Sequence, residues 1–214
     1  TSFLEVSPAD ARLEIGWTVY APDVWATRVN PACKYLLMEW AFEHGFGREQ
    51  LKTEVRSQFD EFRGTPGMLM WLLGNENNYG LSWSSFEIEA LPEGERNTAR
   101  ARYLYSLFGE AIDEIKAKDP HRPVAIANGD LQYIDLIAEE CPNLDVFGTN
   151  VYRGISARDL FQVVHDKLDK PVMYTEFGAD AFNAVTQSED QATQAYYLLG
   201  QWREIYEQSA GKGR

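Results

Sequence analysis

Short apolar runs alternate with longer amphipathic segments from about residue 34 to the end of the chain. The apolar runs have the length of strands and carry few polar positions, which is typical of strands buried on both faces of a parallel sheet. We therefore predict five parallel strands, at residues 34–40, 68–74, 123–128, 144–150 and 171–177.

Amphipathic helices are predicted between these strands. In residues 97–118 the apolar positions recur at helical spacing, and Lys116 and Lys118 suit the negative end of the helix dipole before Asp119 and Pro120 stop the helix. The other predicted helices cover residues 48–64, 131–140, 156–168 and 188–208. Strand, loop and helix therefore form the repeating unit of the chain.

This repeat predicts an α/β fold with right-handed parallel crossovers, either an open doubly wound sheet or a closed (β/α)8 TIM barrel. A complete barrel usually needs about 250 residues, whereas this chain has 214. Five strand-helix units are readable, so we expect an incomplete or truncated barrel. We expect residues 1–214 to form a single domain, in which residues 1–32 are irregular because no helix-length segment separates the strand-length runs at 13–20 and 23–29.

Both ends of the chain indicate a piece of a larger fold. The sequence opens on Thr1 and not on Met, and its last predicted helix runs into Gly-Lys-Gly-Arg with no strand after it. We therefore expect an excised or processed segment, whose open sheet edges would be covered by a partner domain or by self-association.

Composition narrows the range of partners and cofactors. A net charge of -13 disfavours a nucleic-acid partner, and no run approaches the ~18 apolar residues of a membrane span. Cys33 and Cys141 are too few for a disulfide framework. His44, His121 and His165 lie far apart without ligand-like spacing, so we expect no metal site and no other cofactor.

Two predicted strands deliver a glutamate at their carboxyl ends, where α/β folds collect their functional residues. Glu76 follows the run at 68–74, and Glu176 lies at the end of the run at 171–177. A carboxylate beside a buried strand is costly unless it is paired or used, and two carboxylates across a pocket suit glycosidic bond cleavage. The alternative is that each glutamate caps a neighbouring helix or pairs with an arginine such as Arg153.

The surroundings of both glutamates match a known family. "WLLGNENNYG" at residues 71–80 and "YTEFGAD" at residues 174–180 resemble the two signature strand ends of family 2 glycoside hydrolases, the group of β-galactosidase and β-glucuronidase. They also resemble the wider clan of retaining (β/α)8 glycosidases, in which an Asn-Glu pair ends the fourth strand and a second Glu ends the seventh. The resemblance covers roughly residues 34–210 and implies that the five predicted strands are strands three to seven of a barrel.

The resemblance also implies a role for each matching residue. Glu76 would be the general acid/base and Glu176 the nucleophile of a retaining glycosidase. Asn75 would bind the sugar 2-hydroxyl. The strand end "FGTNVYRG" at residues 147–154 looks like the sixth strand, whose Tyr in such enzymes hydrogen-bonds the nucleophile, a place that Tyr152 fits.

Further residues near these strand ends are candidates for binding a carbohydrate substrate. Sugars present flat apolar faces and hydroxyl edges, so amides and aromatic rings are the expected lining. Asn78, Trp83 and Asn150 are such candidates, although each residue type also serves in packing or capping.

Two alternative functions remain open beside hydrolysis. A transglycosylase would use the same two acids, and an inactive carbohydrate-binding barrel fragment would keep them without turnover. A metal-dependent hydrolase is disfavoured because no histidine accompanies either glutamate.

Overall fold

The computed structural model describes residues 2–7, 12–16 and 48–209. The chain divides into two compact units, one made of Thr1–Met68 and Gly80–Tyr103 and the other of Leu69–Tyr79 and Leu104–Arg214. Both predicted catalytic glutamates belong to the second unit. That residues 1–214 act as a single catalytic domain stays a prediction.

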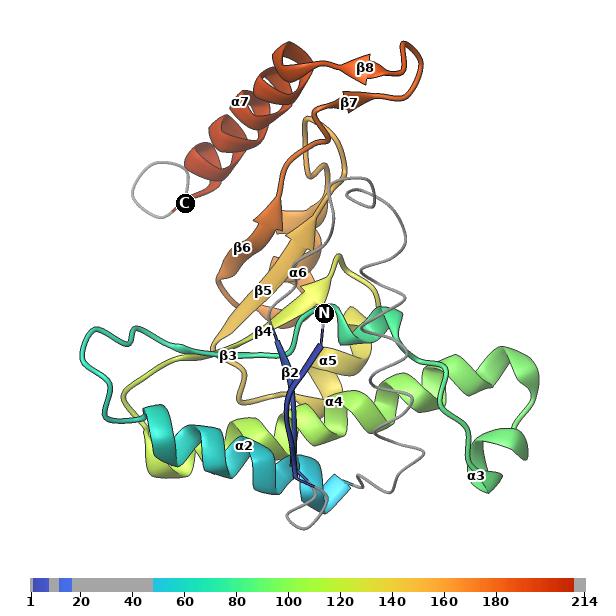
Figure 1. Cartoon of the computed structure of the whole chain (residues 1–214), viewed down its shortest axis with the longest axis vertical. Coiled ribbons are helices and arrows are strands. Elements are labelled where there is room, and N and C mark those ends of the chain that lie inside the picture. Colours follow the sequence, from blue (N-terminus) through green and yellow to red (C-terminus); the bar gives the residue numbers. More distant parts are fainter. Residues whose placement is uncertain (1, 8–11, 17–47, 210–214) are drawn as a thin grey trace. The chain divides into compact units, whose positions relative to one another are not determined.

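A parallel sheet in the order β3-β4-β5-β6 forms the centre of the second unit (Figure 1). All of its strands were predicted from apolar runs, and they run in parallel as expected. Their bounds are β3 Trp71–Leu73, β4 Val124–Gly129, β5 Val146–Val151 and β6 Val172–Phe177. Within the described residues this sheet is open, so the structure shows a partial α/β fold.

The two middle strands hold the core of this sheet. Every residue of β4 is buried, and five of the six residues of β5 are buried, as a strand covered on both faces requires. The outer strands differ: Leu72 in β3 is 47% exposed, and no residue of β6 is fully buried. The apolar run at 68–74 is therefore a strand only at its centre, and β6 forms an accessible edge of the described sheet.

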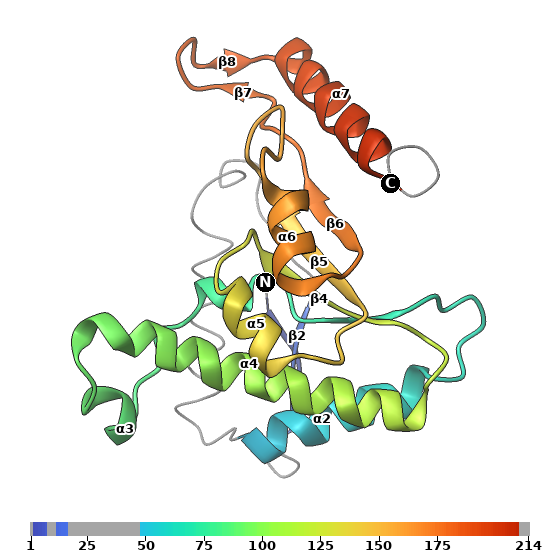
Figure 2. The same ribbon diagram turned by 180° about the vertical axis from the view of Figure 1, so that it is seen from behind.

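Four helices of the second unit follow the predicted order, with shifted starts. Their bounds are α4 Glu93–Lys118, which begins in the first unit, α5 Ile134–Glu140, α6 Leu160–Leu168 and α7 Gln191–Gln208. The start of α7 is set by Asp190, whose side chain accepts a hydrogen bond from Thr193 N, as an N-cap residue does. Figures 1 and 2 together place α5 and α6 on the same face of the sheet.

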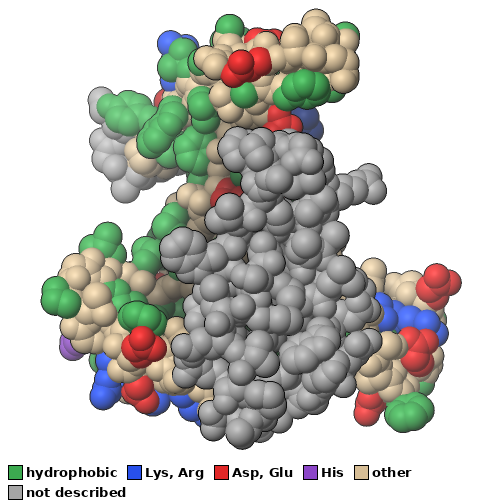
Figure 3. All heavy atoms as spheres, in the orientation of Figure 1, with side chains coloured by type: hydrophobic (Ala, Val, Ile, Leu, Met, Phe, Trp, Pro, Cys, Tyr) green, Lys and Arg blue, Asp and Glu red, His purple; other side chains and the backbone are tan. Residues whose placement is uncertain are grey.

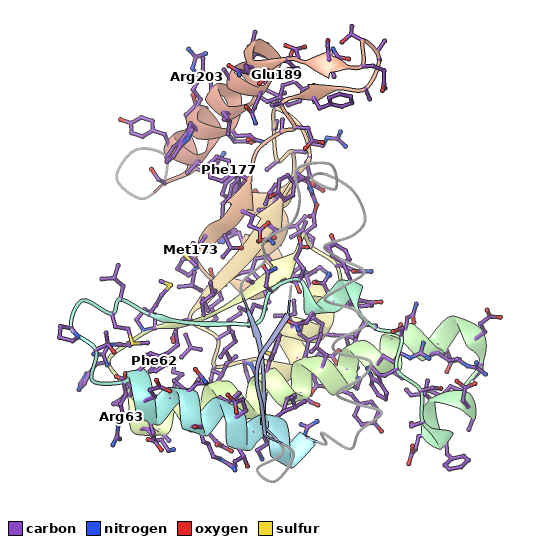
Figure 4. All side chains as sticks on the ribbon, in the orientation of Figure 1. Phe62, Arg63, Met173, Phe177, Glu189 and Arg203 are labelled. Atoms are coloured by element: carbon purple, nitrogen blue, oxygen red, sulfur yellow. The ribbon has the colours of Figure 1, made fainter. Side chains whose placement is uncertain are left out.

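Residues 178–190 connect β6 to α7 and include a short antiparallel ladder of β7 Phe182–Asn183 with β8 Ser188–Glu189. Helix α7 then packs against the ends of β5 and β6. The Gln201 side chain donates hydrogen bonds to the carbonyl oxygens of Gly154 and Gly178, and Phe177, labelled in Figure 4, meets the ring of Trp202 edge-on at 5.7 Å. These contacts fix the loops that follow both strands.

An apolar stripe on α7 stays accessible. Tyr196, Leu199 and Trp202 are 63%, 51% and 59% exposed, and Figure 3 shows hydrophobic side chains gathered on the surface of the C-terminal part of the chain. Single exposed apolar residues are ordinary, but a row of them on one helix is typical of a surface that contacts another chain or domain.

The first unit contains β1 Ser2–Ser7, β2 Arg12–Gly16, α2 Arg48–Phe62 and α3 Phe86–Glu89. Strands β1 and β2 pair in antiparallel fashion, whereas the sequence pattern indicated no strand at residues 2–7. Helix α2 was predicted. The predicted strands at residues 23–29 and 34–40 lie outside the described residues.

Candidate active site

The backbone after β3 turns sharply and presents Asn75 and Glu76. Gly74 has a φ of +70°, a conformation that favours glycine, and a Cβ there would collide with the Asn77 side chain. Asn77 instead uses its Oδ1 to accept a hydrogen bond from Asn75 N at 2.9 Å. Glu76 N donates to Ala127 O of β4 at 2.8 Å, so the turn is tied to the neighbouring strand.

Glu76 itself lies in the left-handed region, with a φ of +53°. For a residue with a Cβ this conformation is uncommon and is often found at functional sites. The side chain is half-buried. Its position directly after the strand, and not inside it, leaves the carboxylate at the carboxyl end of the sheet.

Glu176 reaches the same end of the sheet through an irregularity between β5 and β6. Thr149 pairs with Tyr174, but the next residue, Asn150, pairs with Glu176. Thr175 is therefore an extra residue in β6, as in a β-bulge, which re-aims the side chains that follow it. The bulge places Glu176 beside Asn150, and Glu176 is exposed to solvent.

The charges of both glutamates act on the Tyr152 hydroxyl. Its hydroxyl donates a hydrogen bond of 3.0 Å to Glu176 Oε2. Burial raises the pKa of Tyr152 to about 12, and the hydrogen bond to Glu176 and the negative charges of Glu176, Glu76 and Asp180 add to this effect. Tyr152 is thus a neutral hydrogen-bond donor at physiological pH, close enough to both glutamates to respond to their charges.

Asn150 lies beneath these residues and is only 2% exposed. Its Oδ1 accepts a hydrogen bond of 2.5 Å from the Thr175 hydroxyl, and its Nδ2 donates to Asn75 Oδ1 at 3.2 Å. Side chains from β6, β5 and the loop after β3 thereby form one hydrogen-bonded row. The sequence predicted Asn150 and Asn75 as site residues, and the structure brings them together; Thr175 was missed because threonine inside a strand is ordinary.

Asn78 has a different environment from the other candidates. It is 3% exposed, and its Nδ2 donates to Gly129 O and Gln132 Oε1 while its Oδ1 accepts from Gly129 N. Both amide hydrogens are therefore used within the protein. Asn78 anchors the loop after β3 to the end of β4, and a contact between Asn78 and substrate stays a prediction.

Arg153 does not pair with either catalytic candidate, which was the simplest structural explanation for the two glutamates. Its guanidinium forms a bidentate pair with Asp130, with shortest contact 2.5 Å, and also binds Asp159 at 2.8 Å. Because Asp130 follows β4 and Arg153 follows β5, the pair holds these strand ends together. No motif or spacing in the sequence indicated this ion pair.

Trp83 belongs to the first unit. Its ring packs edge-on against Tyr103 at 5.6 Å, and its carbonyl oxygen accepts a hydrogen bond from Arg100. A contact between Trp83 and a sugar stays a prediction.

The described residues contain no group of three or more His, Cys, Asp or Glu side chains that could hold a metal ion. In this part of the chain no helix is long and apolar enough to cross a membrane. The side chains described at the strand ends include carboxylates, amides and a phenol.

Comparison with known proteins gives a likeness in fold. The chain matches no model of a known protein family and no curated protein. Among solved structures it is similar to a GH2 β-galacturonidase from Eisenbergiella tayi, solved with bound galacturonate, with a TM-score of 0.53 and 18% identity. The match covers 81% of this chain and 29% of that chain, so this chain spans less than a third of that protein's length. The likeness supports a partial α/β fold of the same kind.

Proposed function

We propose that this chain carries the catalytic centre of a retaining glycoside hydrolase, with Glu176 as nucleophile and Glu76 as general acid/base. The observation that carries the proposal is Tyr152, which binds Glu176 through its hydroxyl and is also raised in pKa by the charge of Glu76. Two carboxylates that act on one phenol are candidates for one pocket, as glycoside hydrolysis requires.

The proposed reaction has two displacements. The Glu176 carboxylate attacks the anomeric carbon and the bond to the leaving group breaks, while Glu76 gives its proton to the departing oxygen. Glu76 then takes a proton from water, the water oxygen attacks the same carbon, and the ester bond to Glu176 breaks. The hydrogen bond from the Tyr152 hydroxyl holds the Glu176 carboxylate in place before attack and after release.

The fold comparison adds support of a coarser kind. The similar structure is a β-galacturonidase, so a carbohydrate substrate fits the partial α/β fold and the paired glutamates. A transglycosylase would use the same residues, with a sugar hydroxyl in place of water as the acceptor.

A binding fragment without turnover is the second candidate. It is favoured by the accessibility of β6 and of Leu72 in β3 at the two outer strands of the described sheet. In a closed barrel such edges are covered. On this reading, the chain binds carbohydrate and shows no turnover.

Aryl glycosides with a range of leaving groups test the assignment. Glu76→Gln is expected to lower kcat/KM for substrates with poor leaving groups by roughly 10²- to 10⁴-fold, because proton transfer to the departing oxygen is lost, and to spare kcat/KM for substrates whose leaving group needs no proton. Glu207→Gln, an exposed change on α7, is the matched control and should leave every rate unchanged. An equal loss of kcat/KM for good and poor leaving groups would contradict the role of Glu76.

A further inference from the structure

The side-chain amide of Asn75, which follows β3, has its orientation set from β6, three strands away in the sheet. The row begins at Thr175, the extra residue of β6, whose hydroxyl hydrogen points to Asn150 Oδ1. Threonine can donate or accept, but an amide oxygen can only accept. In the structure the Thr175 hydroxyl donates, so the oxygen of the Asn150 amide faces β6.

Once its oxygen faces Thr175, Asn150 has its NH2 group directed the other way. That group donates to Asn75 Oδ1 at 3.2 Å. Asn150 is 2% exposed, and a buried amide is held strongly to an orientation in which its oxygen and its hydrogens are satisfied. Reversal of the Asn150 amide would require the Thr175 hydroxyl to accept and the Asn75 amide to turn at the same time.

Asn75 is the end of the row and lies at the surface. Its carbonyl oxygen is occupied by Asn150 and its backbone N–H by Asn77. Among the described residues no acceptor is found for its side-chain NH2 group. What Asn75 offers to the space beside Glu76 is therefore a pair of hydrogen-bond donors.

We propose that Thr175 is a positioning residue, which acts through Asn150 to fix the Asn75 amide as a donor toward the substrate. The inference rests on the proposed function for its consequence in catalysis, but the row itself is a property of the folded chain. A substrate that carries an acceptor oxygen beside the reacting carbon is favoured, and one that lacks that oxygen leaves the donors without a partner.

The first arm of the test does not require turnover. In ¹⁵N spectra of the 214-residue chain, Thr175→Val should shift the side-chain amide signals of both Asn150 and Asn75, because the isosteric side chain cannot donate. Thr175→Ser keeps the hydroxyl and should restore the parent signals. Thr149→Val is the matched control, since the Thr149 hydroxyl donates to Asp130 O and not to the row.

The second arm measures selectivity. For the parent we expect a higher kcat/KM for an aryl glycoside with a 2-hydroxyl than for its 2-deoxy analogue. Thr175→Val should reduce that ratio by about tenfold, the usual weight of one hydrogen bond to a substrate, whereas Thr175→Ser and Thr149→Val should keep it within about threefold. A merely structural role for Thr175 would lower both rates together and leave the ratio unchanged, which would overturn the proposal.

The two arms separate failure of the hydrogen-bonded row from failure of the proposed function. If Thr175→Val leaves the amide signals of Asn150 and Asn75 in place, Thr175 does not orient these amides, and the proposal is wrong whatever the enzyme does. If those signals move but the parent cleaves no glycoside in the panel, the effect of Thr175 on the row is supported, and its positioning role in catalysis is overturned together with the proposed function.

Discussion

The hydroxyl of Tyr152 donates a 3.0 Å hydrogen bond to Glu176 Oε2, across the ends of β5 and β6. This bond joins the proposed nucleophile to a donor that stays protonated well above neutral pH. The pairing of β5 with β6 brings the carboxyl ends of these strands side by side, and the bulge at Thr175 places Glu176 at this edge.

The first prediction concerns the ionisation of Tyr152. Burial raises its pKa to about 12, and the hydrogen bond and charge of Glu176 contribute to the rise. Glu176→Gln removes the charge, so the phenolate becomes less unfavourable and Tyr152 should ionise at a lower pH than in the parent. NMR of ring-labelled tyrosine between pH 9 and about 12 measures the change. Glu207→Gln should leave the pKa of Tyr152 unchanged. If Glu176→Gln also leaves it unchanged, the proposed influence of Glu176 on Tyr152 is wrong.

The second prediction concerns the ion pair behind the site. Arg153 binds Asp130 and Asp159, and its side chain is 20% exposed. Hydrogen bonds to charged groups contribute roughly 1.5–3 kcal/mol, and Arg153→Gln should lower the free energy of unfolding by about that amount. Arg158→Gln, at an exposed neighbour, should change it by less than about 0.5 kcal/mol. Urea denaturation compares the two variants, and equal effects would contradict the structure.

The third prediction concerns the closeness of β4 and β5. A Cβ on Gly148 would run into the carbonyl oxygen of Ile126 and press on the methyl group of Thr175 at 3.1 Å. Neither a strand backbone nor a side chain held in the row can move easily, so Gly148→Ala should destabilise the fold by about 1–3 kcal/mol. Gly64→Ala, where a Cβ meets nothing within 4 Å, is the control. Thermal unfolding that ranks the two alike would refute the packing described for this strand pair.

The sequence predicted the part of the fold that depends on local pattern. The apolar runs at 123–128, 144–150 and 171–177 became β4, β5 and β6 with shifts of one or two residues. For β4 and β5 the reason is burial on both faces, which demands continuous apolar character. The run at 68–74 shrank to three residues, since Gly74 and its left-handed backbone end the strand before Asn75. Helix starts moved where a cap such as Asp190 decided them.

The candidate site was only partly predictable for a related reason. Glu76, Glu176 and Tyr152 stand directly at strand ends, so their placement follows from parallel topology. The bulge at Thr175 and the Arg153–Asp130 pair depend on register and on contacts between residues that are distant in sequence. No periodicity encodes such contacts, and the sequence pattern likewise did not indicate the hydrogen bonds of Asn78 with Gly129 and Gln132.

Covalent trapping tests the central claim most directly. A 2-deoxy-2-fluoro glycoside with an activated leaving group slows release of the sugar and lets a retaining enzyme accumulate its glycosyl ester. Peptide mass mapping of the labelled chain should find the sugar on Glu176, and Glu176→Gln should take up none. A sugar attached to any other carboxylate, or turnover of the parent substrate with inversion at the anomeric carbon, would contradict the account.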